Sequence, residues 1–450
     1  MSSAAPLRTL LRLAAPMVLA RVSQSVITFA DAIQVKHLGY KAIAATATGG
    51  LNLLGFLLLA MGTVFIVQSF VAQLVGRGAR DDSPRFAWYG LAIAAIAAVI
   101  AAALIPLVGP ALARSGYSAE VRDQMTSYMA IRMLSMGAVI GVEALGSWYG
   151  GLGNTRMQMI AGILTMAAAV FLNWVLIDGH LGAPAMGVNG AALASTLASF
   201  LGFGFLAVAF WCRWGGAPKA RATGLSLREL GRVLRFGFPN GLNSFLEFAA
   251  FQLFINGVFA RLGDETVAAL NVVSAVNSIS SMPAFGLASA GAILAGQAIG
   301  RKAKDAVWPQ VKVTLLCTMS WMGAIGLTYA LFPVRVLSLF ASDTSGQLVT
   351  IGASMLVTSA AWQLTDAVGM TLAETLRAAG DTAWTAAARI VLAWAVFTPV
   401  AFLIVGRYHG GPVGAMLCFV GYLGLLAILL AWRFKSGAWK RIELLEPKLV

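Results

Sequence analysis

The sequence predicts an all-α polytopic membrane protein with twelve transmembrane helices. They form two six-helix lobes, related by a pseudo-two-fold axis along the membrane normal. Three observations predict this fold. The 450 residues are 59% hydrophobic and only 11% charged, which is more apolar surface than a soluble core of this length can bury. The chain also contains twelve long apolar segments, and its second half repeats motifs of its first half.

The apolar segments justify the helix count, because a spanning helix needs about 20 apolar residues. The first half contains six such segments, at roughly 13–35, 42–74, 86–109, 123–149, 157–178 and 188–212. The second half contains six more, at roughly 232–260, 266–296, 308–332, 348–376, 384–405 and 412–432.

An internal repeat justifies the two lobes. Six short motifs recur in the same order at an offset that drifts from 223 to 228 residues: RLAAP and RFGFP, HLG and RLG, IAA and VAA, QLVGR and QAIGR, GNT and GDT, GAP and GGP. Six helices is an even number, so the second half enters the membrane the same way up as the first. Parallel repeats of this kind commonly form two lobes around a midplane cavity, an architecture suited to alternating access.

Domain boundaries follow from these segments. We expect an N-terminal lobe at 1–212, a linker at 213–230, a C-terminal lobe at 231–435 and a tail at 436–450. The linker is basic and rich in glycine, which is typical of a flexible connection between lobes.

The net charge of +14 is spread over short loops between apolar segments, which argues against a nucleic-acid-binding surface. We assign 23 Lys and Arg residues, including Arg377 and Arg389, to one side of the membrane and seven to the other. The positive-inside rule therefore predicts that both termini and the linker are cytoplasmic. The three cysteines lack metal-ligand spacing, and we expect no cofactor apart from a coupling ion.

Five carboxylates fall inside predicted helices: Asp31, Glu143, Glu247, Asp366 and Glu374. A charge at the bilayer centre costs about 3 kcal/mol on insertion scales. Only Arg21 and Arg132 are expected inside helices as fixed partners, so we infer that some of these acids bind a proton or a small cation.

Helical spacing gives three of the acids polar neighbours on the same face. Asp31 shares a face with Gln24 and Thr28, Glu247 with Asn243, and Asp366 with Gln363. Oxygen-rich faces suit H⁺ or a hard cation such as Na⁺, and Glu247 with Asp366 is the candidate Na⁺ site. The alternative is that each acid is a hydrogen-bonded packing group between helices.

Glu143 and Glu374 differ from these three because they lie nearer the ends of their predicted helices, where water is close. We treat them as secondary candidates for ion coupling.

At these residues the chain resembles the multidrug and toxic compound extrusion (MATE) family, and is most similar to its NorM-like branch. The motifs that carry the resemblance are RLAAP, FAD at Phe29–Asp31, QLVGR, GLGNT, FLNW at Phe171–Trp174, FLEF at Phe245–Phe248 and LTDAV at Leu364–Val368.

The resemblance implies a twelve-helix antiporter, and we expect a monomer in a bacterial-type inner membrane. It would export amphipathic, cationic drugs and other xenobiotics against inward H⁺ or Na⁺. By position, Asp31 and Asn173 resemble the family's N-lobe cation site, and Glu247 and Asp366 the C-lobe site. Many relatives carry a second polar residue one turn before Asn173, where this chain has Ala169.

Three other functions remain open from the sequence. A flippase for lipid-linked precursors shares the broad architecture but needs a cavity rich in Arg and Lys, and only Arg21 and Arg132 are candidates. An intramembrane enzyme needs clustered Asp motifs or a histidine site, which the sequence lacks. A channel is disfavoured because the buried acids do not form a pore-lining ring.

Overall fold

The structure is a computed structural model that describes residues 4–114, 116–219, 224–339 and 346–445. These residues form helices and connecting turns, and no strand occurs among them. Two compact units divide the chain: unit 2 comprises Leu19–Gly241, and unit 1 comprises Met1–Val18 with Leu242–Val450. The boundaries predicted for the lobes, the linker and the tail remain a prediction.

Unit 2 contains most of α1 and the helices that follow it. The long helices are α1 Ala4–Val35, α2 Tyr40–Val64, α3 Val67–Gly76, α4 Pro84–Leu112, α5 Ala119–Leu134, α6 Met136–Gly151, α7 Thr155–Asp178 and α8 Gly187–Trp211. Short 3₁₀ turns lie between them at Lys36–Leu38, Arg80–Asp82, His180–Gly182 and Trp214–Gly216. The helices α2, α4, α5, α7 and α8 enclose a core that includes Met125 and Ile177.

Unit 1 contains the second set of helices. These are α9 Leu227–Leu253, α10 Asp264–Gly300, α11 Val307–Leu331, α12 Pro333–Ser338, α13 Gln347–Ala360, α14 Gln363–Ala379, α15 Thr382–Val391, α16 Thr398–Gly406 and α17 Gly411–Lys435. The part of α9 up to Gly241 belongs to unit 2. The π-helices Phe254–Val258 and Leu392–Phe397 and the 3₁₀ turns Phe259–Leu262, Lys304–Ala306 and Ala438–Arg441 complete this unit.

An aromatic cluster forms much of the unit 1 core. The Phe254 ring lies 4.9 Å from the Phe397 ring and 5.0 Å from the Phe259 ring, and Phe419 packs edge-on against Trp362 at 5.0 Å. The two π-helices provide Phe254 and Phe397, so the irregular turns of α9 and α15–α16 meet in this core.

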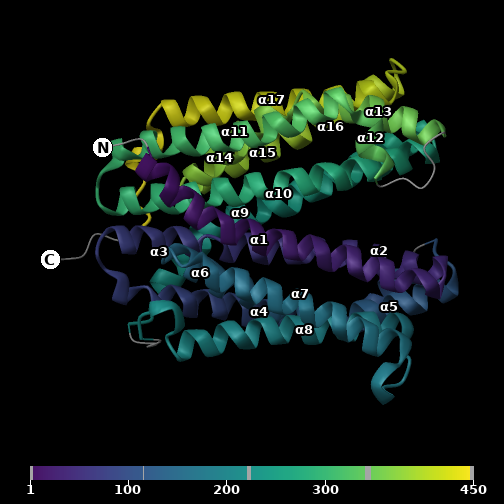
Figure 1. The fold of residues 1–450 in the computed structure, drawn as a ribbon, viewed down its shortest axis with the longest axis horizontal. Helices are drawn as coiled ribbons and strands as arrows, with labels where there is room; N and C mark the ends of the chain where they lie inside the picture. Colours follow the sequence, from purple (N-terminus) through teal and green to yellow (C-terminus); the bar gives the residue numbers. More distant parts are fainter. Residues whose placement is uncertain (1–3, 115, 220–223, 340–345, 446–450) are drawn as a thin grey trace. The chain divides into compact units, whose positions relative to one another are not determined.

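The predicted spans agree with the observed helices. Nine described helical stretches are long and apolar enough to cross a membrane, and the bent pairs α5–α6 and α13–α14 raise the number to 11. The 32-residue helix α1 matches the remaining predicted segment, at about 1.5 Å per residue. Within each unit the long helices run side by side (Figure 1).

The two bent spans are a feature that hydropathy did not predict. The bend is 42° between α5 and α6 and 52° between α13 and α14. At the first bend, the Ser135 hydroxyl donates to the Arg132 carbonyl at 2.7 Å, a bond that competes with the helical ladder. These are the fourth and tenth predicted spans, so the bends occupy equivalent places in the two halves of the repeat.

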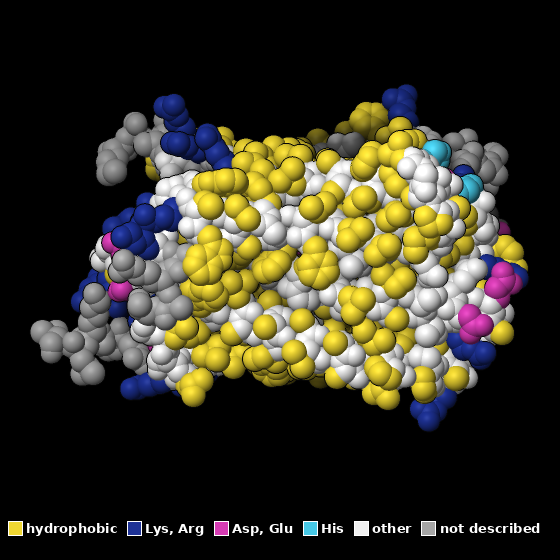
Figure 2. Space-filling view, turned by 90° about the horizontal axis from the view of Figure 1, so that it is seen from below, with side chains coloured by type: hydrophobic (Ala, Val, Ile, Leu, Met, Phe, Trp, Pro, Cys, Tyr) yellow, Lys and Arg dark blue, Asp and Glu magenta, His cyan; other side chains and the backbone are white. Residues whose placement is uncertain are grey.

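Surface composition agrees with membrane insertion. On the visible face, hydrophobic side chains cover the middle of the molecule, and Lys and Arg side chains gather at its two ends (Figure 2). Large apolar side chains such as Val99, Leu201 and Trp211 are 57–69% exposed. Such exposure is stable when lipid rather than water surrounds the helices.

Candidate functional site

Asp31 lies in unit 2, where α1, α7 and α8 approach one another. Asn173 on α7 is fully buried, and its side-chain amide donates to Asp31 Oδ1. Ser195 on α8 donates its hydroxyl to Asp31 Oδ2 at 3.4 Å. The structure thus brings Asp31 and Asn173 together. It also adds Ser195, which the sequence did not indicate because it lies in an otherwise apolar helix.

Ala169 lies one turn before Asn173 and is buried. The position one turn before Asn173 therefore provides no polar side chain to the site. The Asp31 oxygens therefore receive their described hydrogen bonds from only two side chains, Asn173 and Ser195.

Arg132 on α5 supplies positive charge to this region. It interacts electrostatically with both the Asp31 carboxylate and the Tyr128 hydroxyl. Its Nη1 atom is buried without a hydrogen-bond partner among the described residues. A partly buried guanidinium and a partly buried carboxylate here balance each other without a tight ion pair.

Glu143 on α6 is 5% exposed, and Arg21 on α1 donates to its Oε1 at 3.4 Å. The expectation that water lies close to Glu143 was therefore wrong, because the residue sits in the middle of a packed helix. Arg21 also lies over the Phe65 ring, at 5.9 Å from its centroid. The acid is neutralised locally, which is typical of a structural pair.

Glu247 on α9 is held by two side chains from other helices of unit 1. Arg389 on α15 donates through Nη1 to Oε2 at 3.1 Å and to Oε1 at 3.4 Å. The Tyr422 hydroxyl on α17 donates to Oε1 at 3.1 Å. The Glu247 side chain is 36% exposed and that of Arg389 is 20% exposed, so the pair borders an open space.

This pair corrects two predictions from the sequence. The distribution of Lys and Arg predicts that Arg389 lies at a cytoplasmic helix end, and it predicts only Arg21 and Arg132 as partners inside the membrane. Arg389 instead lies within the continuous helical stretch 382–406 and points to Glu247. Its position five residues inside the predicted span 384–405 was a signal that could have identified it. Nothing in the sequence pointed to Tyr422.

Asp366 on α14 lies close enough to this pair for Arg389 and Glu247 to act on it electrostatically. Its carboxylate makes no hydrogen bond or ion pair with the other described residues. The three charged groups Glu247, Arg389 and Asp366 therefore carry a net charge of about −1. One further positive charge would neutralise the cluster.

The polar neighbours of these acids are placed differently from one another. Gln363 is fully buried and donates from Nε2 to Asn277 Oδ1 at 2.8 Å, so it joins α14 to α10 and does not contact Asp366 among the described residues. Asn243 is 8% exposed, and its Oδ1 has no partner there. Gln24 is exposed, and the side chain of Thr28 lies outside the described residues.

Glu374 on α14 is 8% exposed and pairs with Arg377 one turn later on the same helix. The expectation of nearby water was wrong here as well. The arginine donates from Nε to Oε1 at 3.3 Å and from Nη2 to Oε2. Three of the five intramembrane acids thus have an arginine partner, whereas Asp31 and Asp366 have none at ion-pair distance in the part of the chain that the structure describes.

The sequence profile of the MatE family matches residues 16–175 and 239–403, which together make up well over half of the chain. The two matched stretches begin at Pro16 and at Pro239, the prolines that close the repeated motifs RLAAP and RFGFP.

Two relatives are similar over nearly the full length. The probable multidrug resistance protein NorM of Thermotoga maritima is 26% identical over 450 residues, covering 98% of this chain and 95% of that protein. The multidrug resistance protein NorM of Aliivibrio fischeri is 27% identical over 446 residues, covering 94% and 93%.

Solved structures show the same fold. The crystal structure of a MATE in complex with MaL6 superimposes with a TM-score of 0.89 at 22% identity, covering 97% of this chain and 98% of the other. This likeness confirms the predicted all-α, two-lobed membrane fold. The chain belongs to the MatE family, whose members are membrane transporters and not enzymes.

Proposed function

We propose that this protein is a secondary active antiporter of a bacterial plasma membrane. It exports amphipathic, cationic organic compounds in exchange for H⁺ by alternating access, with both termini in the cytoplasm. The multidrug resistance names of its NorM relatives support the substrate class.

The observation that carries the proposal is the charge balance around Asp366. A carboxylate in a membrane helix costs about 3 kcal/mol when it is not neutralised. The Arg389 guanidinium is hydrogen-bonded to Glu247 and neutralises that carboxylate. Asp366 therefore has no cation of its own at ion-pair distance among the described residues. A reversible ligand of Asp366 must therefore be positive.

A proton fits this cluster better than Na⁺. A sodium ion beside Glu247 and Asp366 would lie next to the Arg389 guanidinium and would be repelled by it. A proton binds to a single oxygen and needs no shell of oxygen ligands, whereas a hard cation takes several. No group of three or more His, Cys, Asp or Glu side chains suited to a metal ion occurs in the described part of the chain.

Asp31 with Asn173 is the second coupling position in our proposal. The carboxylate there is solvated by two hydrogen-bond donors and by the charge of Arg132, and protonation would weaken all three interactions. The helices α1, α7 and α8 would then repack, which gives the proton a way to change the packing of unit 2.

Efflux of a cationic dye from proteoliposomes tests the proposal. Wild-type protein should export the dye under an imposed pH gradient, and a Na⁺ gradient alone should drive little export. Asp31→Asn and Asp366→Asn should abolish pH-driven efflux while the purified variants stay monodisperse and folded. Glu265→Gln is the matched control, because Glu265 is an exposed acid in the first turn of α10 and should leave efflux unchanged.

Two results would reject the proposal. Efflux that persists at the wild-type rate in both variants would show that the two acids do not couple ions to transport. Efflux driven only by a Na⁺ gradient would show that Na⁺, not H⁺, is the coupling ion.

The arginines disfavour a flippase for pyrophosphate-bearing lipids, since Arg21 and Arg389 are already bound to Glu143 and Glu247. Transport of such a lipid in the same vesicles would favour that function instead.

A further inference from the structure

A basic cavity opens at the end of unit 2 where α4 begins. It has a volume of about 590 Å³, and four cationic side chains line it: Arg80, Arg85, Arg213 and Lys219. The acids Asp81 and Asp82 also line it, so the cationic groups outnumber the anionic ones. The sequence assigns this end of the molecule to the cytoplasm through its excess of Lys and Arg.

Two of these cations are available to a ligand. Arg85 is engaged, because its Nη1 lies 3.2 Å from Glu229 Oε1, and Arg80 donates to the Gly216 carbonyl at 2.9 Å. Arg213 and Lys219 are exposed and make no hydrogen bond or ion pair with other described residues. The cavity therefore contains uncompensated positive charge.

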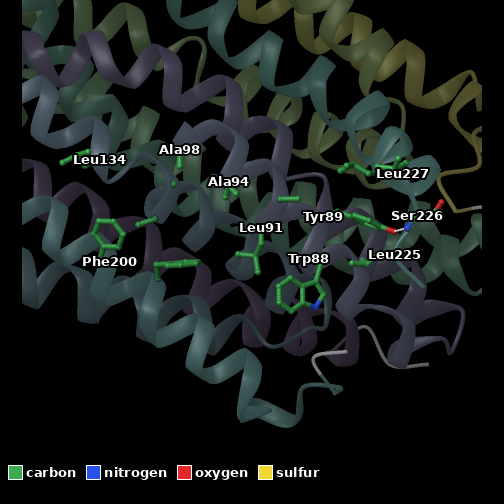
Figure 3. Close-up of a pocket in the computed structure, with 16 residues that line it drawn as sticks. Trp88, Tyr89, Leu91, Ala94, Ala98, Leu134, Phe200, Leu225, Ser226 and Leu227 are labelled. Carbon is green, nitrogen blue, oxygen red and sulfur yellow. Dashed lines mark hydrogen bonds between the residues drawn. The ribbon is translucent and has the colours of Figure 1, made fainter. Parts of the chain in front are cut away.

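A second cavity of about 740 Å³ extends along the same helix toward the membrane interior. Its walls are almost entirely apolar and come from α4, α8, the α5–α6 bend and the start of α9. Tyr89 and Ser226 meet at one end of this groove, and Phe200 and Leu134 lie at the other (Figure 3). The lining of α4 runs from Trp88 to Ala98, roughly 15 Å at 1.5 Å per residue.

The basic cavity and the apolar groove meet at a shared set of hydrogen bonds. Arg85 lines the first cavity, and Tyr89, one helical turn later, lines the second. Glu229 joins them, since it also accepts a hydrogen bond of 2.8 Å from the Tyr89 hydroxyl. The Tyr89 hydroxyl in turn accepts the Ser226 N–H at 2.8 Å. A single elongated molecule could occupy both cavities.

The surroundings define what that molecule is. Exposed apolar side chains flank the groove on both helices, with Ile96 and Val99 on α4 and Leu197 and Leu201 on α8. These side chains face hydrocarbon in a membrane protein, so the groove is continuous with the bilayer. Its length of roughly 15 Å is half of a hydrocarbon core of about 30 Å, which corresponds to the acyl chain of one leaflet.

We propose that unit 2 binds an anionic phospholipid of the cytoplasmic leaflet. Its phosphate-bearing headgroup lies in the basic cavity near Arg213 and Lys219, and one acyl chain lies in the apolar groove along α4. Basic pockets beside membrane helices on the cytoplasmic side are known to hold anionic headgroups. Lys219 lines the basic cavity and Leu227 lines the apolar groove. The lipid would therefore contact both ends of the segment between α8 and α9.

Native mass spectrometry of the full chain in detergent tests this site. Phosphatidylglycerol and phosphatidylcholine with the same acyl chains are titrated separately, and wild-type protein should bind the anionic lipid more tightly. Each juxtamembrane Lys or Arg contributes a factor of about five, so Arg213→Gln with Lys219→Gln should weaken phosphatidylglycerol binding roughly thirty-fold. Ala95→Trp, which places an indole in the groove, should weaken binding of both lipids.

Matched variants control for charge and bulk. Arg301→Gln with Lys302→Gln removes the same charge from an exposed turn in unit 1, and Ala103→Trp adds the same bulk at an exposed position of α4 outside the groove. Both should bind the lipids as the wild type does. If Ala95→Trp elutes as aggregate, Ala92→Phe fills the same groove with a smaller ring.

The outcomes separate the possible ligands. Equal binding of the two lipids by wild-type protein, or full binding by the doubly neutralised Arg213 and Lys219 variant, would overturn the headgroup site. Unchanged binding by the folded groove variant would overturn the acyl-chain site. Glycerol phosphate should not displace the bound lipid, and displacement would identify a soluble phosphate ligand instead.

Discussion

Replacing Arg389 by glutamine is the perturbation whose effect follows most directly from the geometry of unit 1. Arg389→Gln removes the guanidinium that lies 3.1 Å from Glu247 Oε2. Among the described residues, Glu247 and Asp366 then repel each other electrostatically with no neighbouring cation, and Glu247 keeps the Tyr422 hydroxyl as its hydrogen-bond donor.

The size of the effect can be worked from the distance. Two unit charges 3.1 Å apart attract by about 5 kcal/mol at an effective dielectric constant of 20. The side chains are 20% and 36% exposed, so solvent screens the pair and we expect a coupling of about 2 to 3 kcal/mol. Arg389→Gln alone should lower the free energy of unfolding by about 3 kcal/mol, because it leaves Glu247 partly buried and unpaired.

A double-mutant cycle measures this coupling. Unfolding free energies are determined in mixed micelles by denaturant titration for Arg389→Gln, Glu247→Gln and the double variant. The double variant should lose less stability than the sum of the single variants, by about 2 kcal/mol. Additivity to within about 0.5 kcal/mol would refute the reasoning, since it would mean that the two side chains do not interact energetically.

Three further predictions concern a tightly packed glycine with its control, a buried ion pair and an exposed ion pair. Gly190→Ala should destabilise the protein by about 1 to 3 kcal/mol, because its Cβ would lie 2.3 Å from the Leu176 carbonyl oxygen. Gly204→Ala on the same helix meets nothing within 4 Å and should be neutral or slightly stabilising in thermal unfolding. Asp381→Asn should cost about 3 kcal/mol of unfolding free energy, since the 3% exposed carboxylate receives two hydrogen bonds from one arginine; an unchanged melting temperature would contradict this. Asp305→Asn should have no measurable effect at neutral pH. A lysine hydrogen bond lowers the pKa of Asp305, so any contribution of that exposed pair is present above the ordinary Asp pKa of about 3.9 and is lost as pH falls through the lower folded value.

Hydropathy was sufficient to predict the helices, because a bilayer forces each apolar segment to satisfy its own backbone hydrogen bonds. It did not predict where two of them bend. Ser135 lies in an apolar segment without a proline beside it, and only the tertiary structure shows that its hydroxyl bonds to the backbone of the previous turn. The second bend, at Ala361 and Trp362, falls 226 residues later. That spacing lies within the offset of the sequence repeat, so comparing the halves could have located one bend from the other.

The free-energy cost of a charge inside a membrane was enough to identify the acids from the sequence. It did not identify the side chains that pair with them. Glu247 and Arg389 are 142 residues apart, and no helical periodicity connects them. Asn173 was identified by family resemblance, whereas Ser195 had no signal because a serine is common in a membrane helix. Sequence therefore shows which charges need a partner, and the packing of helices decides which partner each one receives.

The central claim is that Asp366 binds the ion that drives export, and substrate exchange compared with gradient-driven efflux tests it most directly. In Asp366→Asn proteoliposomes, the account predicts that a labelled dye still exchanges against unlabelled dye without any gradient. The same vesicles should fail to accumulate or expel dye when a pH gradient is imposed. Efflux driven by a pH gradient at the wild-type rate in Asp366→Asn would contradict the account.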